Sequence, residues 1–288
     1  MLMEVQLINK LVMNNITKII LPVIVIFVLI ILLLIFTNRN YKDYDFKIYF
    51  FNAGKADAIV LSKNDHYIMI DTGEESLSNE ILEYFKKNNI TKLDYLIITH
   101  FDKDHVGSAS SIIDNIDVEN VLQSNYPKDS EYYNNYVESL RNKNITAITV
   151  SDNYEFVISG LKITVNGPTG VYENNESNNS SLIVTVVNDS KKFLFMGDSQ
   201  NARIKDFLEI SDTDYDFIKI PYHGHYLKRL DGILENNEIK YAVITSSDKE
   251  LEDDETIEML NNYNINCYLT RKGPVTILSN GEDIVIKQ

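Results

Sequence analysis

Four side chains of the kind that bind transition metals lie within six consecutive residues, in the stretch ITHFDKDHVGS at residues 97–107. They are His100, Asp102, Asp104 and His105, and they follow an apolar run that is typical of a buried strand. Neither a strand nor a helix gathers all four side chains on one face. A loop wrapped around a cation does, because imidazole nitrogens and carboxylate oxygens are the usual ligands of zinc, manganese and iron. The alternative is a solvated turn in which Asp104 caps a helix that begins near His105.

An apolar run of eighteen residues, from Ile19 to Phe36, contains no charged or polar side chain. It is long enough to cross a bilayer as a helix, which takes about 20 apolar residues. A cleaved signal peptide would have a shorter apolar region and a pair of small residues for the peptidase, which the following IFTNRNYK lacks. We therefore predict an uncleaved, single-pass anchor in the cell membrane.

The anchor divides the chain into a short tail at 1–18, the transmembrane helix at 19–36, a linker at 37–44 and one domain at 45–288. The tail carries two lysines and the α-amino group, which favours a cytoplasmic tail by the positive-inside rule. We therefore expect the domain to be extracytoplasmic.

The charge of the chain argues against a polyanionic partner. Its formal net charge is −15, and the first forty residues hold three basic side chains and one acidic one, so the remainder carries −17. Such a domain repels duplex DNA at long range. Cys267 is the only cysteine, which excludes an intrachain disulfide and a cysteine-based zinc site.

Short apolar strands alternate with amphipathic helices after residue 45, which predicts an α/β domain of sheets with helices packed outside. Three further strand ends carry polar residues: Asp71 in MIDTG, Asp198 in FLFMGDS, and His223 with His225 in FIKIPYHGH. Each alone is an ordinary turn or an exposed histidine. Together they place four of the five histidines beside carboxylates at strand ends, where sheet folds gather functional groups.

This series of motifs resembles that of the metallo-β-lactamase-fold hydrolases. The branch it resembles most is the ComEC-like one, which includes competence-protein nuclease domains and cell-surface phosphodiesterases. That branch writes its metal loop as His-x-Asp-x-Asp-His, as residues 100–105 do, and NAGKADAIVL at 52–61 and NNSSLIV at 178–184 are similar to its first loop and a later strand. The resemblance runs from about Lys47 to Val285 and implies an αββα sandwich.

The resemblance also implies two divalent metal ions, Zn²⁺ or Mn²⁺, and a metal-bridging water that attacks the substrate. His100 and Asp102 would hold one ion. Asp104, His105 and His223 would hold the other, with Asp198 bridging the two ions. Asp104 and His223 are also implied as catalytic residues, while Asp71 and Asp57 would support the ligands from behind.

Several positions depart from the pattern of the branch. Asn52 stands where an Asp is usual, Tyr222 replaces the first His of His-His-Gly, His225 replaces a Ser, and Leu251-Glu252 stands in place of a later His-Pro. His225 is a candidate to supply the missing imidazole. Tyr222 is either a hydrogen-bond donor to a phosphoryl oxygen or a packing residue.

We interpret the chain as a membrane-anchored two-metal hydrolase that acts on a small or singly charged phosphoester, with single-stranded nucleic acid as a further possible partner. One alternative is a DNA nuclease of the competence type, although one span provides no built-in channel and the charge opposes duplex binding. The other is a metal-binding sensing domain without turnover, which the departures at Tyr222, His225 and Leu251 favour.

Overall fold

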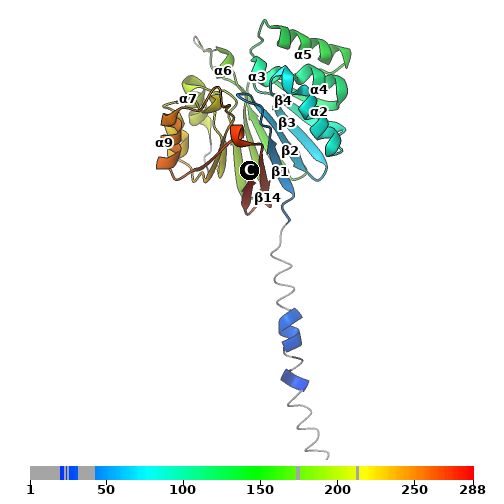
Figure 1. Cartoon of the computed structure of the whole chain (residues 1–288), viewed down its shortest axis with the longest axis vertical. Coiled ribbons are helices and arrows are strands. Elements are labelled where there is room, and N and C mark those ends of the chain that lie inside the picture. The colour runs from blue at the N-terminus through cyan, green and yellow to red at the C-terminus, as the bar shows by residue number, and fades with distance from the viewer. Residues whose placement is uncertain (1–19, 23, 25, 32–42, 173–175, 212–213) are drawn as a thin grey trace, which may run out of the picture. The chain divides into compact units, whose positions relative to one another are not determined.

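A computed structural model describes residues 20–22, 24, 26–31, 43–172, 176–211 and 214–288 (Figure 1). The chain divides into two units, Met1–Asp43 and Tyr44–Gln288.

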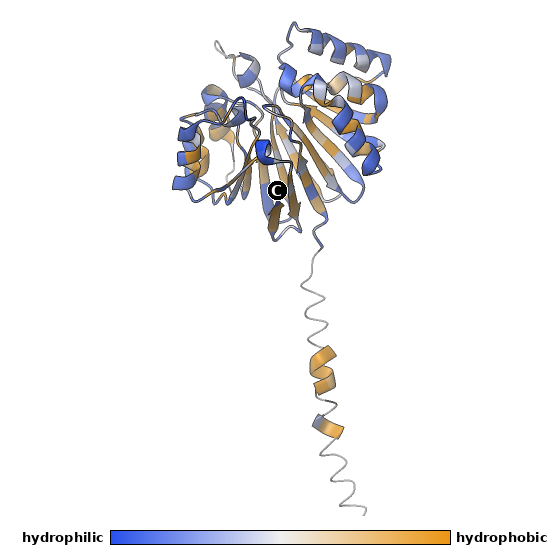
Figure 2. Cartoon of the chain, in the orientation of Figure 1, coloured by the Kyte–Doolittle hydropathy of each residue, from blue (hydrophilic) through white to orange (hydrophobic). Residues whose placement is uncertain are grey.

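The predicted transmembrane helix at 19–36 lies partly outside the described residues, as do the tail at 1–18 and most of the linker. Residues 20–22, 24 and 26–31 of that span are helical and apolar (Figure 2). Among the described residues, no helix has the length and apolar character needed to cross a membrane.

The second unit contains two sheets that face each other. The first has the order β15-β14-β1-β2-β3-β4-β5-β6, and the second has the order β13-β12-β11-β10-β9-β8-β7. The first sheet comprises β1 (Phe46–Phe50), β2 (Ala58–Lys63), β3 (His66–Thr72), β4 (Lys92–Ile98), β5 (Asp117–Ser124), β6 (Ile148–Val150), β14 (Val275–Ser279) and β15 (Ile284–Lys287). The second comprises β7 (Asn153–Ile158), β8 (Leu161–Asn166), β9 (Ile183–Asn188), β10 (Lys191–Phe195), β11 (Phe217–Lys219), β12 (Tyr241–Ile244) and β13 (Asn266–Leu269).

The inner faces of the two sheets form a shared apolar core. In β1 every second residue is fully buried, namely Phe46, Ile48 and Phe50, because side chains alternate between the two faces of a strand. Phe46 meets Phe193 of the facing sheet edge to face, with ring centroids 5.3 Å apart. Burial of this apolar surface supplies the main driving force that holds the sheets together.

Helices cover the outer face of each sheet (Figure 1). They are amphipathic, and their apolar sides turn toward the sheets (Figure 2). In α2, for example, the buried residues Ile81 and Phe85 are one turn apart and share a face. The helices are α2 (Ser78–Lys87), α3 (Lys103–Val106), α4 (Ala109–Asn115) and α5 (Glu131–Asn142) on the first sheet, and α6 (Glu176–Asn179), α7 (Asn201–Ile210), α8 (Leu230–Glu235) and α9 (Asp254–Asn262) in the second half. The predicted αββα sandwich is confirmed.

The parallel strands of each sheet determine where polar groups gather. Strands β3, β4, β5 and β6 run parallel to one another, and so do β10, β11, β12 and β13. Their carboxyl ends therefore share an edge within each sheet. Asp71 lies at the end of β3, and His100, Asp198 and His223 lie just after β4, β10 and β11, respectively. The fold thus delivers residues from distant parts of the sequence to one end of the sandwich.

Candidate metal centre

Four of the predicted ligands form one group at this end of the sandwich. Asp104, His105, Asp198 and His223 each offer a ligand atom, and these atoms all lie within 4.8 Å of one another. Asp198 is central, because its Oδ1 is 3.4 Å from His105 Nε2 and its Oδ2 is 3.2 Å from His223 Nε2. Asp104 Oδ2 lies 3.3 Å from His223 Nε2. One carboxylate therefore contacts both imidazoles of this group, each through a different oxygen.

His100 and Asp102 lie beside this group rather than within it. The ring centroids of His100 and His105 are 4.0 Å apart, and His100 Nε2 is 4.0 Å from Asp102 Oδ1. The helix-capping alternative for this stretch is wrong, because α3 begins at Lys103 and Asp104 lies inside it. Asp102 occupies the capping position, where its side chain makes no capping hydrogen bond.

The buried ring nitrogens point to a cation. Among the described residues, the Nε2 atoms of His100, His105 and His223 and the Oδ1 atom of Asp198 are buried without a hydrogen-bond partner. Buried polar atoms rarely stay unpaired, because each unpaired atom costs about 1–3 kcal/mol. The atoms of His105, His223 and Asp198 belong to one group, and the ring of His100 lies beside it, 4.0 Å from that of His105. This donor set of imidazole and carboxylate fits a divalent transition metal ion.

Each histidine is held through its other ring nitrogen, which leaves Nε2 free. His105 Nδ1 donates to Asp71 Oδ2 at 2.7 Å, and His223 Nδ1 lies 3.1 Å from the carbonyl oxygen of Thr245. His100 Nδ1 lies 3.2 Å from the hydroxyl of Thr99. Such partners fix the tautomer and orientation of an imidazole that binds a metal through Nε2.

Asp71 is held rigidly where it contacts His105. Its Oδ1 accepts from the backbone N–H of Thr99 at 2.7 Å, and its Oδ2 accepts from the Thr99 hydroxyl at 2.6 Å. The backbone φ angle of Asp71 is 53°, and those of Tyr222 and His223 are 51° and 53°. Residues other than glycine rarely adopt this left-handed backbone conformation. Backbone strain of this kind is concentrated at functional sites. The packed sandwich holds these turns in place.

A fully buried lysine, Lys219, lies behind the group and was not predicted from the sequence. Its ammonium pairs with Asp57 and donates to the carbonyl oxygen of Gly197 at 3.1 Å. Asp57 also accepts from the Thr245 hydroxyl at 2.6 Å, and Thr245 in turn contacts His223. Asp57 therefore reaches His223 through Thr245. The signal that could have identified Lys219 is a lone lysine within the apolar strand FIKIP.

The carboxylates of this group stabilise positive charge on the neighbouring histidines. Burial lowers the pKa of His223, but Asp198 and the other carboxylates outweigh burial and raise it to about 9. The pKa of His105 is likewise raised well above its usual value, mainly by Asp198 against the effect of burial. Burial tends to raise the pKa of Asp198, but the two histidines hold it well below its ordinary value. The group therefore attracts cations, whether protons or metal ions.

His100 behaves differently from the other two imidazoles. Burial, together with repulsion from the charge on His105, lowers the pKa of His100 to about 4. It is therefore a neutral imidazole at pH 7, in the form that binds a metal ion without first releasing a proton.

The residues at the departing positions lie outside the group of four. Tyr222 is half-buried and its ring centroid is 4.8 Å from that of His225. His225 Nδ1 lies 3.2 Å from Oδ1 of Asp253, the residue just before α9, so this imidazole already contacts a carboxylate outside the group. Leu251 is exposed. The structure does not bring these three side chains into the cluster of candidate ligands.

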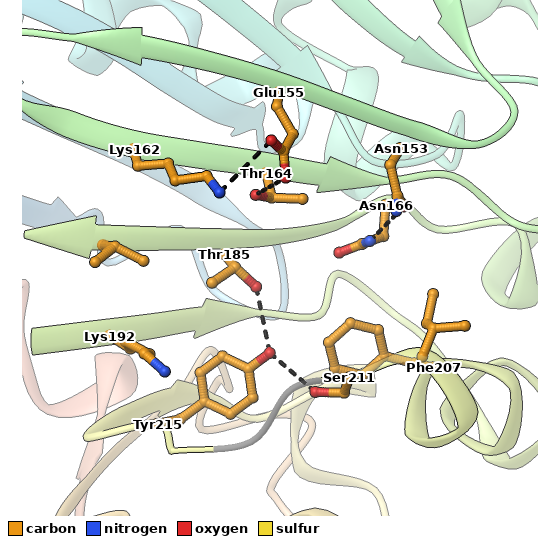
Figure 3. A pocket seen from close by; sticks show the side chains of 12 residues that line it. Asn153, Glu155, Lys162, Thr164, Asn166, Thr185, Lys192, Phe207, Ser211 and Tyr215 are labelled. Carbon is orange, nitrogen blue, oxygen red and sulfur yellow. Dashed lines mark hydrogen bonds and ion pairs between the residues drawn. The ribbon is translucent and has the colours of Figure 1, made fainter.

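A separate cavity of about 310 Å³ lies between strands β7–β9 and helix α7 (Figure 3). Within it, Tyr215 Oη contacts the hydroxyls of Thr185 at 3.4 Å and Ser211 at 3.1 Å, and Glu155 pairs with Lys162 at 3.5 Å. None of the candidate ligands lines this cavity. Its polar groups partner one another, so we assign the functional site to the strand ends instead.

Comparisons with known proteins agree with this geometry. The model of the Metallo-beta-lactamase superfamily matches residues 52–245. Recombination protein 2 of Haemophilus influenzae is 26% identical over 201 residues, which cover 68% of this chain and 23% of that protein. The chain thus spans about a quarter of that relative's length.

Two solved structures share the fold. The metallo-beta-lactamase fold protein YhfI from Bacillus subtilis has a TM-score of 0.53 at 10% identity, with 78% of this chain and 96% of that one covered. Igni18, described as a novel metallo hydrolase from Ignicoccus hospitalis, has a TM-score of 0.51 at 17% identity, with 84% and 98% covered. Because the family match extends over more than half of the sequence, this chain belongs to the metallo-beta-lactamase superfamily of metal-dependent hydrolases.

Proposed function

We propose that this chain is a ComEC-like, two-metal phosphodiesterase, anchored by the helix at 19–36 with its hydrolase domain outside the cytoplasm. The observation that carries the proposal is that the buried, unpartnered Nε2 atoms of His105 and His223 both face Asp198, with that of His100 in the adjacent ring. In the loop after β4, Asp102 and Asp104 lie between His100 and His105. Mixed nitrogen and oxygen ligands are compatible with both Zn²⁺ and Mn²⁺.

His100, Asp102 and Asp198 would hold one ion, and Asp104, His105, Asp198 and His223 would hold the other. Two bound divalent ions would lower the pKa of a water and polarise the phosphoryl oxygens of a substrate. The role of the surrounding residues is to position the ligands. Asp71 and Thr245 hold His105 and His223 with Nε2 forward, so the ligand set is organised before an ion arrives.

Asp104 is the candidate residue for orienting the attacking water. Its side chain is partly exposed, so a substrate can reach it. Burial tends to raise its pKa, but the nearby imidazoles of His223 and His105 hold it far below the usual value. The carboxylate is therefore ionised at pH 7 and can orient the attacking water by accepting a hydrogen bond from it.

Two other functions follow from specific observations. The similarity to Recombination protein 2 favours a DNA nuclease, although the net charge of −17 beyond residue 40 opposes binding of duplex DNA. The engagement of His225 with Asp253 favours a binding domain that keeps its ions but lacks turnover. A substrate test separates these possibilities from the phosphodiesterase.

The substrate test uses the full-length chain, purified in mild detergent and supplied with Mn²⁺ or Zn²⁺. We expect the chain to hydrolyse bis-p-nitrophenyl phosphate. It should cleave single-stranded DNA more slowly and duplex DNA more slowly still, because the acidic surface repels polyanions. Release of p-nitrophenol and gel analysis of labelled DNA measure these rates. Rapid duplex cleavage at physiological salt would favour the nuclease instead. A metal-loaded, folded chain that is inactive on phosphodiesters, phosphomonoesters and lactones would favour the binding domain.

The membrane anchor is tested by fractionation. We expect the full-length chain to sediment with membranes and to resist extraction by carbonate, because an apolar span of this length partitions stably into a bilayer. Protease added to intact cells should digest residues 45–288, as measured by immunoblotting. A domain that is cut only after the membrane is permeabilised would place it in the cytoplasm, and a chain found in the supernatant would contradict the anchor.

A further inference from the structure

The candidate ligand Asp102 is already bound by a cationic side chain. Lys128 Nζ donates to Asp102 Oδ1 at 2.6 Å. The hydroxyl of Ser177 donates to the same oxygen. This oxygen is also the one that lies 4.0 Å from the unpartnered Nε2 of His100. The atom that would complete an ion site with His100 is therefore the atom that Lys128 holds.

The contact joins two segments that are distant in the sequence. Lys128 comes from the loop between β5 and α5, and Ser177 comes from α6, at the same end of the sandwich (Figure 1). The neighbouring residues Tyr126 and Glu176 are also hydrogen-bonded to each other. These contacts hold the backbone around Lys128 close to Asp102. The Lys128 side chain is partly exposed, so its ammonium can turn away toward solvent.

The other half of the centre has no equivalent competitor among the described residues. Its nearest ammonium, on Lys219, is 3.9 Å from Asp198 Oδ1 and is already paired with Asp57. An ammonium and a divalent cation on one carboxylate oxygen repel each other, because both carry positive charge at short range. Binding an ion between His100 and Asp102 therefore requires Lys128 to leave.

We propose that Lys128 is a positioning residue that makes the two metal positions unequal. This inference rests on the proposed two-metal function. The Asp104, His105, Asp198 and His223 position binds its ion first and tightly. The His100 and Asp102 position binds a second ion more weakly, because that ion must displace the ammonium of Lys128 from Asp102. Lys128 then becomes available at the edge of the centre to contact an anionic oxygen.

The test is equilibrium titration of the full-length, metal-stripped chain with Mn²⁺, with free ion read from its EPR signal, and a parallel series with Zn²⁺ by calorimetry. We expect two classes of site in the wild-type protein. Lys128→Met should strengthen the weaker site by about tenfold, within the usual range for coupled charged ligands, and leave the tighter site unchanged. Neither readout depends on catalysis.

Lys103→Met is the matched control, because it removes a lysine from the same region that pairs with Glu74 rather than with Asp102. It should change neither affinity, which separates direct competition from a general change in local charge. Circular dichroism and thermal unfolding check that both variants are folded. Equal affinities at two sites in the wild type, or a Lys128→Met protein whose weaker site is unchanged, would overturn the inference and leave the phosphodiesterase proposal standing. A wild-type chain that binds no ion would overturn both.

Discussion

His223→Ala and Asp104→Asn each reduce phosphodiester hydrolysis by about 10³-fold or more, if the centre acts as proposed. The physical reasons differ. His223 supplies a buried imidazole that faces both Asp198 and Asp104, so its loss removes a ligand and leaves two carboxylates without their partner. Asp104→Asn keeps the shape of the side chain but removes the negative charge that would hold an ion and orient the attacking water. Initial rates with bis-p-nitrophenyl phosphate at saturating metal measure both effects.

The matched control for this prediction is His66→Ala. His66 begins β3, lies on the surface and pairs with Asp94, away from the candidate ligands. Its replacement should leave the rate of hydrolysis within about twofold of wild type, because substitutions on the surface and away from the site have small effects. An Asp104→Asn protein with wild-type kcat would remove Asp104 from the catalytic group. A fully active His223→Ala protein would remove His223 as a ligand.

Asp198→Ala should lose at least one of two bound ions after metal-replete expression. Asp198 contacts both imidazoles of one ion position and is proposed to hold the second ion as well, so its removal would take a ligand from both positions. Elemental analysis of the purified chain gives the metal content per polypeptide. We expect close to two ions in the wild type and one or none in the variant.

Asp231→Ala is the matched control for the metal count. Asp231 is an exposed carboxylate on α8 that accepts a hydrogen bond from Tyr263, and it is not part of the candidate centre. It should retain the wild-type metal content. A folded wild-type protein that contains no metal would refute the assignment of the centre, and an Asp198→Ala protein that retains two ions would refute the bridging role.

Local patterns in the sequence predicted an α/β domain with polar residues at strand ends, while the αββα order of layers and the ligand set were implied by the resemblance to a known family. Apolar runs with a period of two or of about 3.6 residues mark strands and helices, because a side chain's direction follows directly from the local backbone. The polar residues that follow those runs, such as His100, Asp198 and His223, could therefore be assigned to strand ends. Local patterns suffice for such features because they depend on neighbouring residues.

The partners of those ligands were decided only by the tertiary structure. Asp57 and Thr245 are 188 positions apart in the chain, yet they share a hydrogen bond behind His223. The apolar strand around Lys219 marks it as unusual, but its partner Asp57, just before β2, could be identified only once the two sheets were packed together.

The same limit applies to the residues around the edge of the centre. The sequence places Asp102 in the metal loop, but its contact with Lys128 depends on how the loop after β5 folds over that loop. Similarly, His225 could be a ligand by its type and spacing, whereas the turn directs it to Asp253. The direction of a side chain in a loop depends on packing against segments distant in the sequence. Residue type and order therefore predicted which groups gather here, and only the packing of the two sheets determined which of them pair with each other and which keep a free atom for a metal ion.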